Sequence, residues 1–151
     1  MNKTIKVNPK SKYLSDEFSK LPSNCLFNKG ITGCGGTTLE IEAKRDSIIL
    51  VPNINLVLNK CNVYKNLIGV YGDITESELS SSLQSAVGYK KIIATYDALS
   101  KILNVLKEQA YNYFLLIDEY HILFNSYAFR YKPIKFILDN YYKFKNYCFM
   151  T

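Results

Sequence analysis

The sequence lacks several features that would mark a well-defined class of protein. Its four cysteines form neither a C-x-x-C pair nor another spacing typical of metal ligands, which argues against a zinc site. No apolar run approaches the ~20 residues that cross a bilayer, and the first residues lack the apolar core of a signal peptide. We therefore expect a protein of the reducing cytoplasm that has no membrane partner.

Acidic residues are also fewer than basic ones. The 151 residues include 19 Lys and Arg against 13 Asp and Glu, which gives a net charge of +6 and favours an anionic partner, nucleic acid first. The hydrophobic content of 48% is ordinary for a globular protein, and this length supports one core. Residues 1–22 are polar and contain Pro9 and Pro22, so we expect an N-terminal polar segment followed by one domain over 23–151.

Apolar runs alternate with segments of helical periodicity along that domain. We expect strands at 24–28, 47–51, 67–71, 91–95, 113–118 and 147–150. We expect helices at about 37–44, 54–62, 75–86, 97–108 and 133–145, and a short one at 15–21. Thr75 and Asp97 are candidate N-caps. Repeated strand and helix units predict an α/β fold with a mainly parallel sheet.

The most informative segment is the expected strand at 113–118, which runs directly into two acids and the only histidine of the chain. A buried parallel strand reads as a continuous apolar run, and ligands of such sheets bind beyond the carboxyl ends of the strands. We expect Asp118 to face Mg²⁺ and Glu119 to point toward a water molecule beside a terminal phosphate. The alternative is a strand that simply ends in solvated acids.

A second informative segment, residues 24–44, has the order strand, glycine loop, helix. Against the phosphate-loop pattern G-x-x-x-x-G-K-[ST], Gly30 and Gly35 match the glycines and Thr37 matches the hydroxyl residue. Such a loop brings backbone N–H groups close to phosphate oxygens. The expected nucleotide-binding residues are Gly30, Gly33, Cys34, Gly35, Gly36, Thr37 and Thr38. The alternative is a glycine-rich turn without a ligand.

The loop departs from the pattern at Gly36, where the lysine belongs. That ammonium normally offsets charge on the terminal phosphates, and losing such a contact costs on the order of 10²–10³ in rate. No residue is an obvious substitute, because Lys29 precedes the loop and Lys44 follows it by about two helical turns. If the loop binds phosphate, Gly36→Lys should tighten ATP binding.

With these two segments in place, the chain resembles the first RecA-like domain of superfamily 2 helicases and translocases, the group with an Asp-Glu-x-His box. The resemblance covers residues from about 24 to 151. Gly30 to Thr38 would fill motif I without its lysine, Asp118 to His121 would fill motif II, and 148–151 resembles the strand that enters motif III. It implies a three-layer RecA-like P-loop fold.

The resemblance also implies roles for individual residues. Thr37 and Asp118 would hold Mg²⁺ beside ATP, with Asp118 and Glu119 as the catalytic pair, and His121 would couple the ATP site to motif III and a second domain. Two loops that touch the nucleic-acid backbone in the family correspond to Pro52, Asn53, Thr95 and Tyr96.

The helicases of this superfamily need a second RecA-like domain, and the sequence here stops in motif III. We therefore expect half a motor, completed by a longer parent chain or a partner protein, in which ATP hydrolysis is coupled to movement on DNA or RNA. Two alternatives are a catalytically inactive module that binds nucleotide or nucleic acid, and an interaction protein that keeps only the scaffold.

Overall fold

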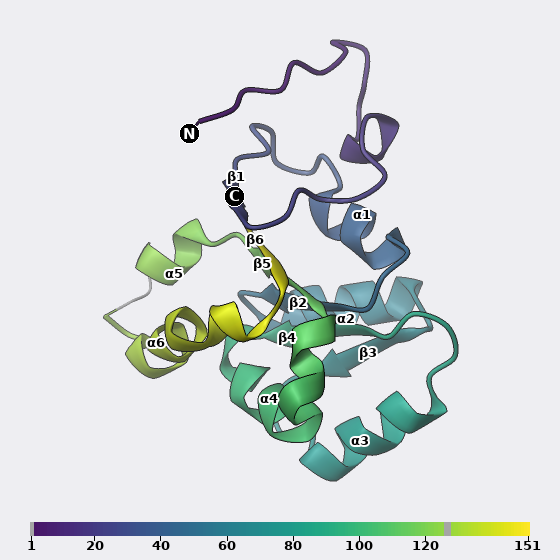
Figure 1. Cartoon of the computed structure of the whole chain (residues 1–151), viewed down its shortest axis with the longest axis vertical. Helices are drawn as coiled ribbons and strands as arrows, with labels where there is room; N and C mark the ends of the chain where they lie inside the picture. The colour runs from purple at the N-terminus through teal and green to yellow at the C-terminus, as the bar shows by residue number, and fades with distance from the viewer. Residues whose placement is uncertain (1, 126–127) are drawn as a thin grey trace.

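The structure is a computed structural model that describes residues 2–125 and 128–151. It contains a six-stranded sheet in which every strand pairing is parallel (Figure 1). The strands, in their order across the sheet, are β1 (Cys25–Phe27), β6 (Asn146–Met150), β5 (Phe114–Asp118), β2 (Ser47–Val51), β4 (Lys91–Thr95) and β3 (Leu67–Val70). The predicted α/β class with a parallel sheet is confirmed.

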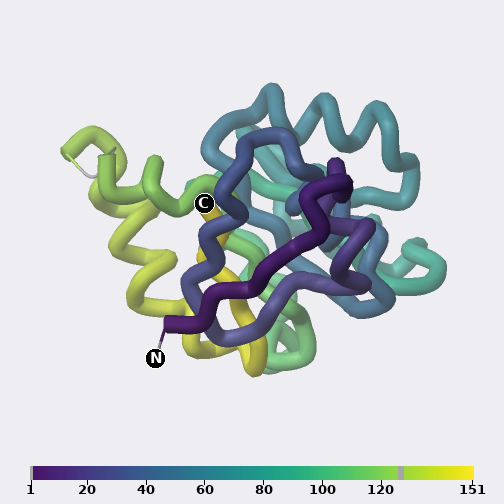
Figure 2. Tube along the Cα trace, turned by 90° about the horizontal axis from the view of Figure 1, so that it is seen from above, coloured from purple at the N-terminus to yellow at the C-terminus, as the bar shows by residue number. Residues whose placement is uncertain are grey.

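Helices follow the strands along the chain. The α-helices are α1 (Gly36–Glu42), α2 (Ile54–Val63), α3 (Glu76–Ser85), α4 (Leu99–Leu106), α5 (His121–Asn125) and α6 (Tyr131–Asn140). Short 3-10 helices are η1 (Leu14–Asp16), η2 (Tyr96–Ala98), η3 (Lys107–Asn112) and η4 (Tyr141–Lys143). Figure 1 and Figure 2 both place α5 and α6 together at one side of the molecule.

The sheet is covered on both faces because successive side chains of a strand point to opposite sides. In β2, Ile48 and Leu50 belong to the core that contains the apolar residues of α3, α4 and α6, whereas Ile49 and Val51 belong to the core that contains those of α1 and α2. All five residues of β2 are buried. The fold therefore has three layers, and its central strands read as continuous apolar runs for this reason.

The N-terminal segment is part of the second core. Its residues Leu14 and Leu21 are buried in the cluster that also contains Leu39 and Ile41 of α1. The Leu14 N–H also donates to the carbonyl of Cys34 at 2.8 Å. Figure 2 shows this segment crossing beside the loop that precedes α1. The polar composition of residues 1–22 gave no sign of this anchoring.

The helices differ from the sequence expectations in several places. The short helix expected at 15–21 is replaced by the 3-10 turn η1, and α5 was not expected. The helix expected at 133–145 ends at Asn140 and continues only as η4, with the Asn140 side chain turned back onto the carbonyl of Phe136 at 2.7 Å. Asp97 does not cap α4, because its carboxylate pairs with Arg130 instead. Thr75 does cap α3, in a reciprocal capping box with Glu78.

Within the described residues, no helix is both long enough and apolar enough to cross a membrane. What positions a site in this fold is the order of the strands. The carboxyl ends of β1 and β5 lie on either side of β6, so the glycine loop after β1 and the acids after β5 meet at one edge of the sheet.

Candidate functional site

The glycine loop has the backbone geometry that its sequence predicts. Gly30, Gly33 and Gly35 all have a positive φ, at 76°, 74° and 83°, a region that L side chains rarely adopt. Gly35 is the N-cap of α1 and has no side chain to cap the helix, so the first N–H groups of α1 remain available. The loop and the start of α1 therefore present backbone donors toward the acids of β5.

Thr37 and Asp118, predicted as the metal pair, are in direct contact. The Thr37 hydroxyl donates a hydrogen bond to Oδ2 of Asp118, which is 5% exposed. Burial and the neighbouring Glu119 raise the pKa of Asp118, against the opposing effects of the Thr37 hydrogen bond and the Lys29 charge. The second oxygen, Oδ1, is buried without a hydrogen-bond partner. The Lys29 ammonium lies 3.6 Å from this oxygen, beyond hydrogen-bond distance, so the oxygen can still accept a bond from a ligand.

Glu119 occupies a strained turn directly after β5. Its φ of 55° is unusual for a residue with a side chain and costs on the order of 1 kcal/mol. Neighbouring bonds hold the turn, because the Tyr96 hydroxyl donates to the Asp118 carbonyl at 2.6 Å and the Tyr120 N–H donates to the Met150 carbonyl at 3.0 Å. The turn directs the Glu119 carboxylate back toward the glycine loop, where it meets Lys29.

Lys29, which the sequence analysis set aside because it precedes the loop, lies beside both acids. Its Nζ lies 2.6 Å from Oε1 of Glu119 and 3.6 Å from Oδ1 of Asp118, and its side chain is 8% exposed. Burial by itself lowers the pKa of Lys29, but the hydrogen bond to Glu119 and the charges of both acids outweigh it and raise the pKa. The ammonium therefore remains charged. Lys29 and Glu119 are 90 residues apart along the chain, which had hidden this proximity.

Gly36 cannot carry a larger side chain without a rearrangement. A Cβ atom at this position would lie 2.5 Å from Sδ and 2.8 Å from Cε of Met150, which is fully buried on β6. The glycine at the position of the missing lysine is thus explained by the packing of α1 against β6. The expectation that Gly36→Lys alone tightens ATP binding ignored this contact and needs a matching change at Met150.

These groups surround a pocket of about 470 Å³. The predicted residues that line it are Gly33, Gly35, Gly36, Thr37, Thr38, Asp118 and Glu119. Gly30 and Cys34, also predicted, are not among its lining residues. Gly30 lies in the outer turn of the loop, where its N–H donates to Asn28, and Cys34 is buried in the core beneath the loop.

The pocket also contains residues that the sequence analysis did not single out. Tyr13 and Ser15 reach it from the N-terminal segment, and Lys60 reaches it from α2, where its Nζ donates to the Thr38 hydroxyl at 2.9 Å. Lys29 and Lys60 give the pocket two cations, which suits a polyanionic ligand. No local sequence pattern signals them, because both reach the pocket only through the tertiary fold.

The side chains present fit a magnesium ion that arrives with phosphate. Across residues 2–125 and 128–151, no group of three His, Cys, Asp or Glu side chains is arranged to hold a metal ion. Magnesium differs from zinc in this respect, since it commonly uses one or two carboxylates and completes its shell with water and substrate phosphates. The unpartnered Oδ1 of Asp118 and the adjacent Thr37 hydroxyl provide such an incomplete shell.

His121, expected to couple the site to motif III, contacts the end of β6. Its Nδ1 lies 2.7 Å from the Thr151 hydroxyl and 3.4 Å from Oε2 of Glu119. The imidazole is therefore next to the two residues that its expected role requires. The contact with Thr151 joins the start of α5, after β5, to the residue that follows β6.

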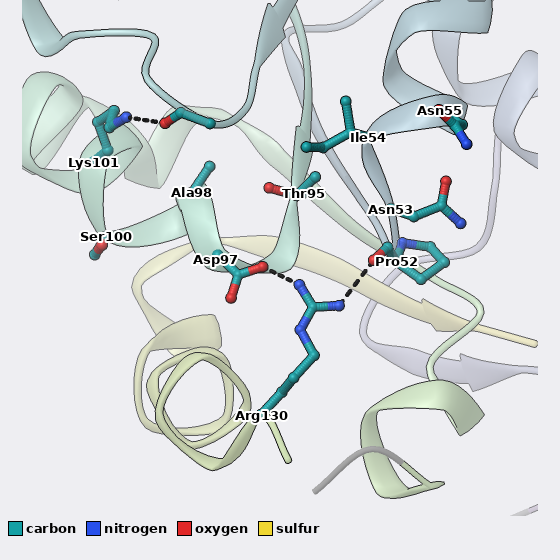
Figure 3. A pocket seen from close by; sticks show the side chains of 11 residues that line it. Pro52, Asn53, Ile54, Asn55, Thr95, Asp97, Ala98, Ser100, Lys101 and Arg130 are labelled. Carbon is teal, nitrogen blue, oxygen red and sulfur yellow. Dashed lines mark hydrogen bonds and ion pairs between the residues drawn. The ribbon is translucent and has the colours of Figure 1, made fainter.

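A second pocket, of about 550 Å³, lies at the carboxyl ends of β2 and β4 (Figure 3). Three of the four predicted nucleic-acid contacts, Pro52, Asn53 and Thr95, line it together with Lys101 and Arg130. The Arg130 guanidinium points between Asp97 and Pro52, donating to the Pro52 carbonyl at 2.9 Å (Figure 3).

Three of the four predicted nucleic-acid contacts are buried side chains. Thr95 is 5% and Tyr96 2% exposed, and Pro52 is also buried. Tyr96 packs inward because its hydroxyl reaches the carbonyl of Asp118, so its side chain is not a surface contact as predicted. Asn53 alone of the four is exposed, with its side chain accepting the Leu56 N–H at the start of α2.

A scan against protein-family models found no match to the chain, and a search of curated proteins found none either.

Proposed function

We propose that this chain is the nucleotide-binding domain of a superfamily 2 helicase or translocase, which binds ATP with Mg²⁺ at the edge of its sheet. The observation that carries the proposal is the meeting of Thr37 with the buried Asp118 beneath the glycine loop, with one Asp118 oxygen left without a hydrogen bond. A glycine-rich turn that serves only to connect β1 to α1 gives no reason for a carboxylate to be desolvated there.

The backbone and side-chain groups of the pocket have distinct roles in the proposed site. Backbone N–H groups of Gly33 to Thr37 donate to the phosphate oxygens, where the start of α1 adds positive partial charge. Thr37 and Asp118, which contact each other, would hold the magnesium ion, and Glu119 would orient the attacking water. The ion, when bound, neutralises charge that develops on the phosphate oxygens.

The proposal also includes a second RecA-like domain and a nucleic-acid partner. A second RecA-like domain, in the same polypeptide or in a partner, closes over the nucleotide, and His121 with Thr151 transmits the state of the site to it. Nucleic acid then lies along the carboxyl ends of β2 and β4, near Asn53. The net charge of +6 favours this partner.

A second candidate function, nucleotide binding without hydrolysis, has an observation of its own. The Glu119 carboxylate is paired with Lys29 at 2.6 Å, so the group that would orient water is already neutralised. In this version the domain senses nucleotide and keeps the same pocket.

Calorimetry with ATP and Mg²⁺ tests the common part of both versions. We expect weak binding by the wild-type chain, and its loss in Asp118→Ala. Binding that survives in a folded Asp118→Ala variant contradicts the proposed site. Hydrolysis by the chain alone should be near background, because a second domain contributes to the transition state; turnover at ~1–100 s⁻¹ would exclude the non-hydrolysing version.

A further inference from the structure

The backbone of Lys29 is held by hydrogen bonds, and its side chain extends toward the two acids. Its N–H donates to the Thr151 carbonyl at 2.9 Å, and its carbonyl accepts the Ile31 N–H at 2.9 Å, so both backbone polar groups of Lys29 are hydrogen-bonded. Figure 2 shows the end of β6 beside this part of the loop. From that anchor the ammonium reaches Glu119 at 2.6 Å and lines the same pocket as Gly33, Gly36 and Thr37.

The other end of the loop is closed to an ammonium. Gly36 packs on the end of the Met150 side chain, which would have to move to make room for a Cβ at this position. Lys60, the other cation of the pocket, belongs to α2 and donates to the Thr38 hydroxyl at 2.9 Å. Among the described residues, Lys29 is the cation that forms an ion pair with the predicted metal ligand Asp118, at 3.6 Å from the oxygen that has no hydrogen bond.

We propose that Lys29 supplies the ammonium of this phosphate site from the front of the loop, pairing with the terminal phosphates of a nucleoside triphosphate when one is bound and with Glu119 when none is. The inference rests on the proposed function, since it names a residue of the same pocket. Lys29 acts here by direct contact with the ligand, and Glu119 is its alternative partner.

The arrangement makes metal and nucleotide binding depend on each other. A divalent cation on Oδ1 of Asp118 would lie within a few ångströms of the Lys29 ammonium, and like charges at that distance repel strongly in a buried setting. Phosphate oxygens give the ammonium another partner and remove the conflict. A divalent cation alone should thus bind poorly, and nucleotide should improve its affinity, with the reciprocal effect required by linkage.

Replacing Lys29 with methionine tests this, because it removes the charge and keeps an unbranched chain. The probes are Mn²⁺ alone, followed by electron paramagnetic resonance, and Mg²⁺ with ATP or with AMP, followed by calorimetry. We expect Lys29→Met to weaken ATP binding by about 10-fold to 100-fold, the range for a charged hydrogen bond, and to leave AMP binding within about twofold. Binding of Mn²⁺ alone should become several-fold tighter.

Weaker ATP binding together with tighter Mn²⁺ binding separates a ligand contact from a structural role, since a variant that merely loses its fold loses both ligands. Lys65→Met, at an exposed position outside the pocket, is the matched control and should change neither affinity. Lys29→Arg keeps the charge and should retain most of the ATP affinity. If Lys29→Met leaves two uncompensated acids and fails to fold, the same change is made in a Glu119→Gln background and compared with Glu119→Gln alone.

Unchanged ATP affinity in a folded Lys29→Met variant overturns the inference while the proposed function stands. A wild-type chain that binds neither ATP nor AMP overturns the proposed function, and the inference with it. Equal losses of ATP and AMP affinity would also overturn the inference, because an ammonium on the terminal phosphates cannot act on a ligand that lacks them.

Discussion

The Thr37 hydroxyl has two proposed roles: it donates a hydrogen bond to Asp118, and it completes the coordination shell of a metal ion. Thr37→Val keeps the shape of the side chain and removes the donor, so the buried Asp118 carboxylate loses the hydrogen bond from this hydroxyl. We expect it to lower the free energy of unfolding by about 1–3 kcal/mol. It should also abolish the dependence of ATP affinity on Mg²⁺. Urea denaturation and calorimetry with and without Mg²⁺ measure the two effects.

Thr37→Ser is the matched control, because it retains the hydroxyl and should preserve both properties. A folded Thr37→Val variant whose ATP affinity still rises with Mg²⁺ would show that this hydroxyl is not a metal ligand.

Another buried charge lies at the opposite ends of the strands. Lys91, at the start of β4, is 2% exposed, and its Nζ donates to the Glu40 carbonyl at 2.8 Å and to the Ser47 hydroxyl at 3.0 Å. Burial lowers the pKa of Lys91 to about 8, from 10.5 in the unfolded chain, in spite of the nearby Glu40 charge. Glu40 itself is fully buried and pairs with Arg45 at 2.5 Å.

The sign of the pH dependence follows from these values. Between about pH 8 and 10.5 the unfolded chain holds the Lys91 proton more often than the folded chain, so Lys91 makes the free energy of unfolding rise with pH in this window. Below pH 8 both states are protonated and the full penalty remains, at most about 3 kcal/mol.

Lys91→Met should therefore cost little stability at pH 7 and should lose this gain. Denaturant unfolding of both proteins at pH 7.5 and 9.5 isolates the effect of Lys91 from that of titrating thiols, because only the difference between the two proteins is used. A stability difference that stays constant between the two pH values would contradict the assignment.

At the scale of elements, the contact between α1 and β6 decides what the glycine loop can contain. Gly36→Ala introduces a Cβ into the space of the Met150 thioether, and overpacking of a core site costs typically about 1–3 kcal/mol. The end of a methionine side chain is flexible, so we expect a value at the lower end of this range. Met150→Ala should recover most of it when combined with Gly36→Ala, measured as a coupling energy in a double-mutant cycle.

The same pair of positions allows a better test of the Gly36→Lys substitution. Gly36→Lys with Met150→Ala provides room for the new side chain, and in a Lys29→Met background it should restore part of the lost ATP affinity. Additive effects of the two changes at Gly36 and Met150 would mean that the close approach is relieved elsewhere in the structure.

The sequence predicted the elements well because its signals there are local. The apolar runs of β2, β4 and β5 are buried at every residue, and the Thr75 capping box lies within one helical turn. The pairing of Thr37 with Asp118 was also within reach, since parallel strands end at one edge. Lys29 and the buried Tyr96 were missed, because their partners are 90 and 22 residues away in the chain.

At the scale of the whole molecule, the excess of positive charge and the second pocket together suggest where a nucleic-acid strand would lie. Asn53 is the exposed member of the predicted contacts, and the cations Lys101 and Arg130 line the same pocket (Figure 3). The Thr95→Asp substitution that its position in the sequence suggests is unsuitable, because a carboxylate would be buried there.

Asn53→Asp is a cleaner probe of this surface. Aspartate caps a helix as well as asparagine does, so the bond to the Leu56 N–H and the start of α2 should persist while a negative charge enters the pocket. For a single-stranded oligonucleotide we expect micromolar or weaker affinity in the wild type, falling with salt at a slope of about −0.7 per phosphate contacted. Asn53→Asp should weaken binding several-fold more than Asn2→Asp, which makes the same charge change at an exposed site near the N-terminus.

Fluorescence anisotropy over a range of salt concentrations measures both the affinity and the slope. Equal losses in the two variants would mean that charge alone holds the strand and that the ends of β2 and β4 are not its binding surface.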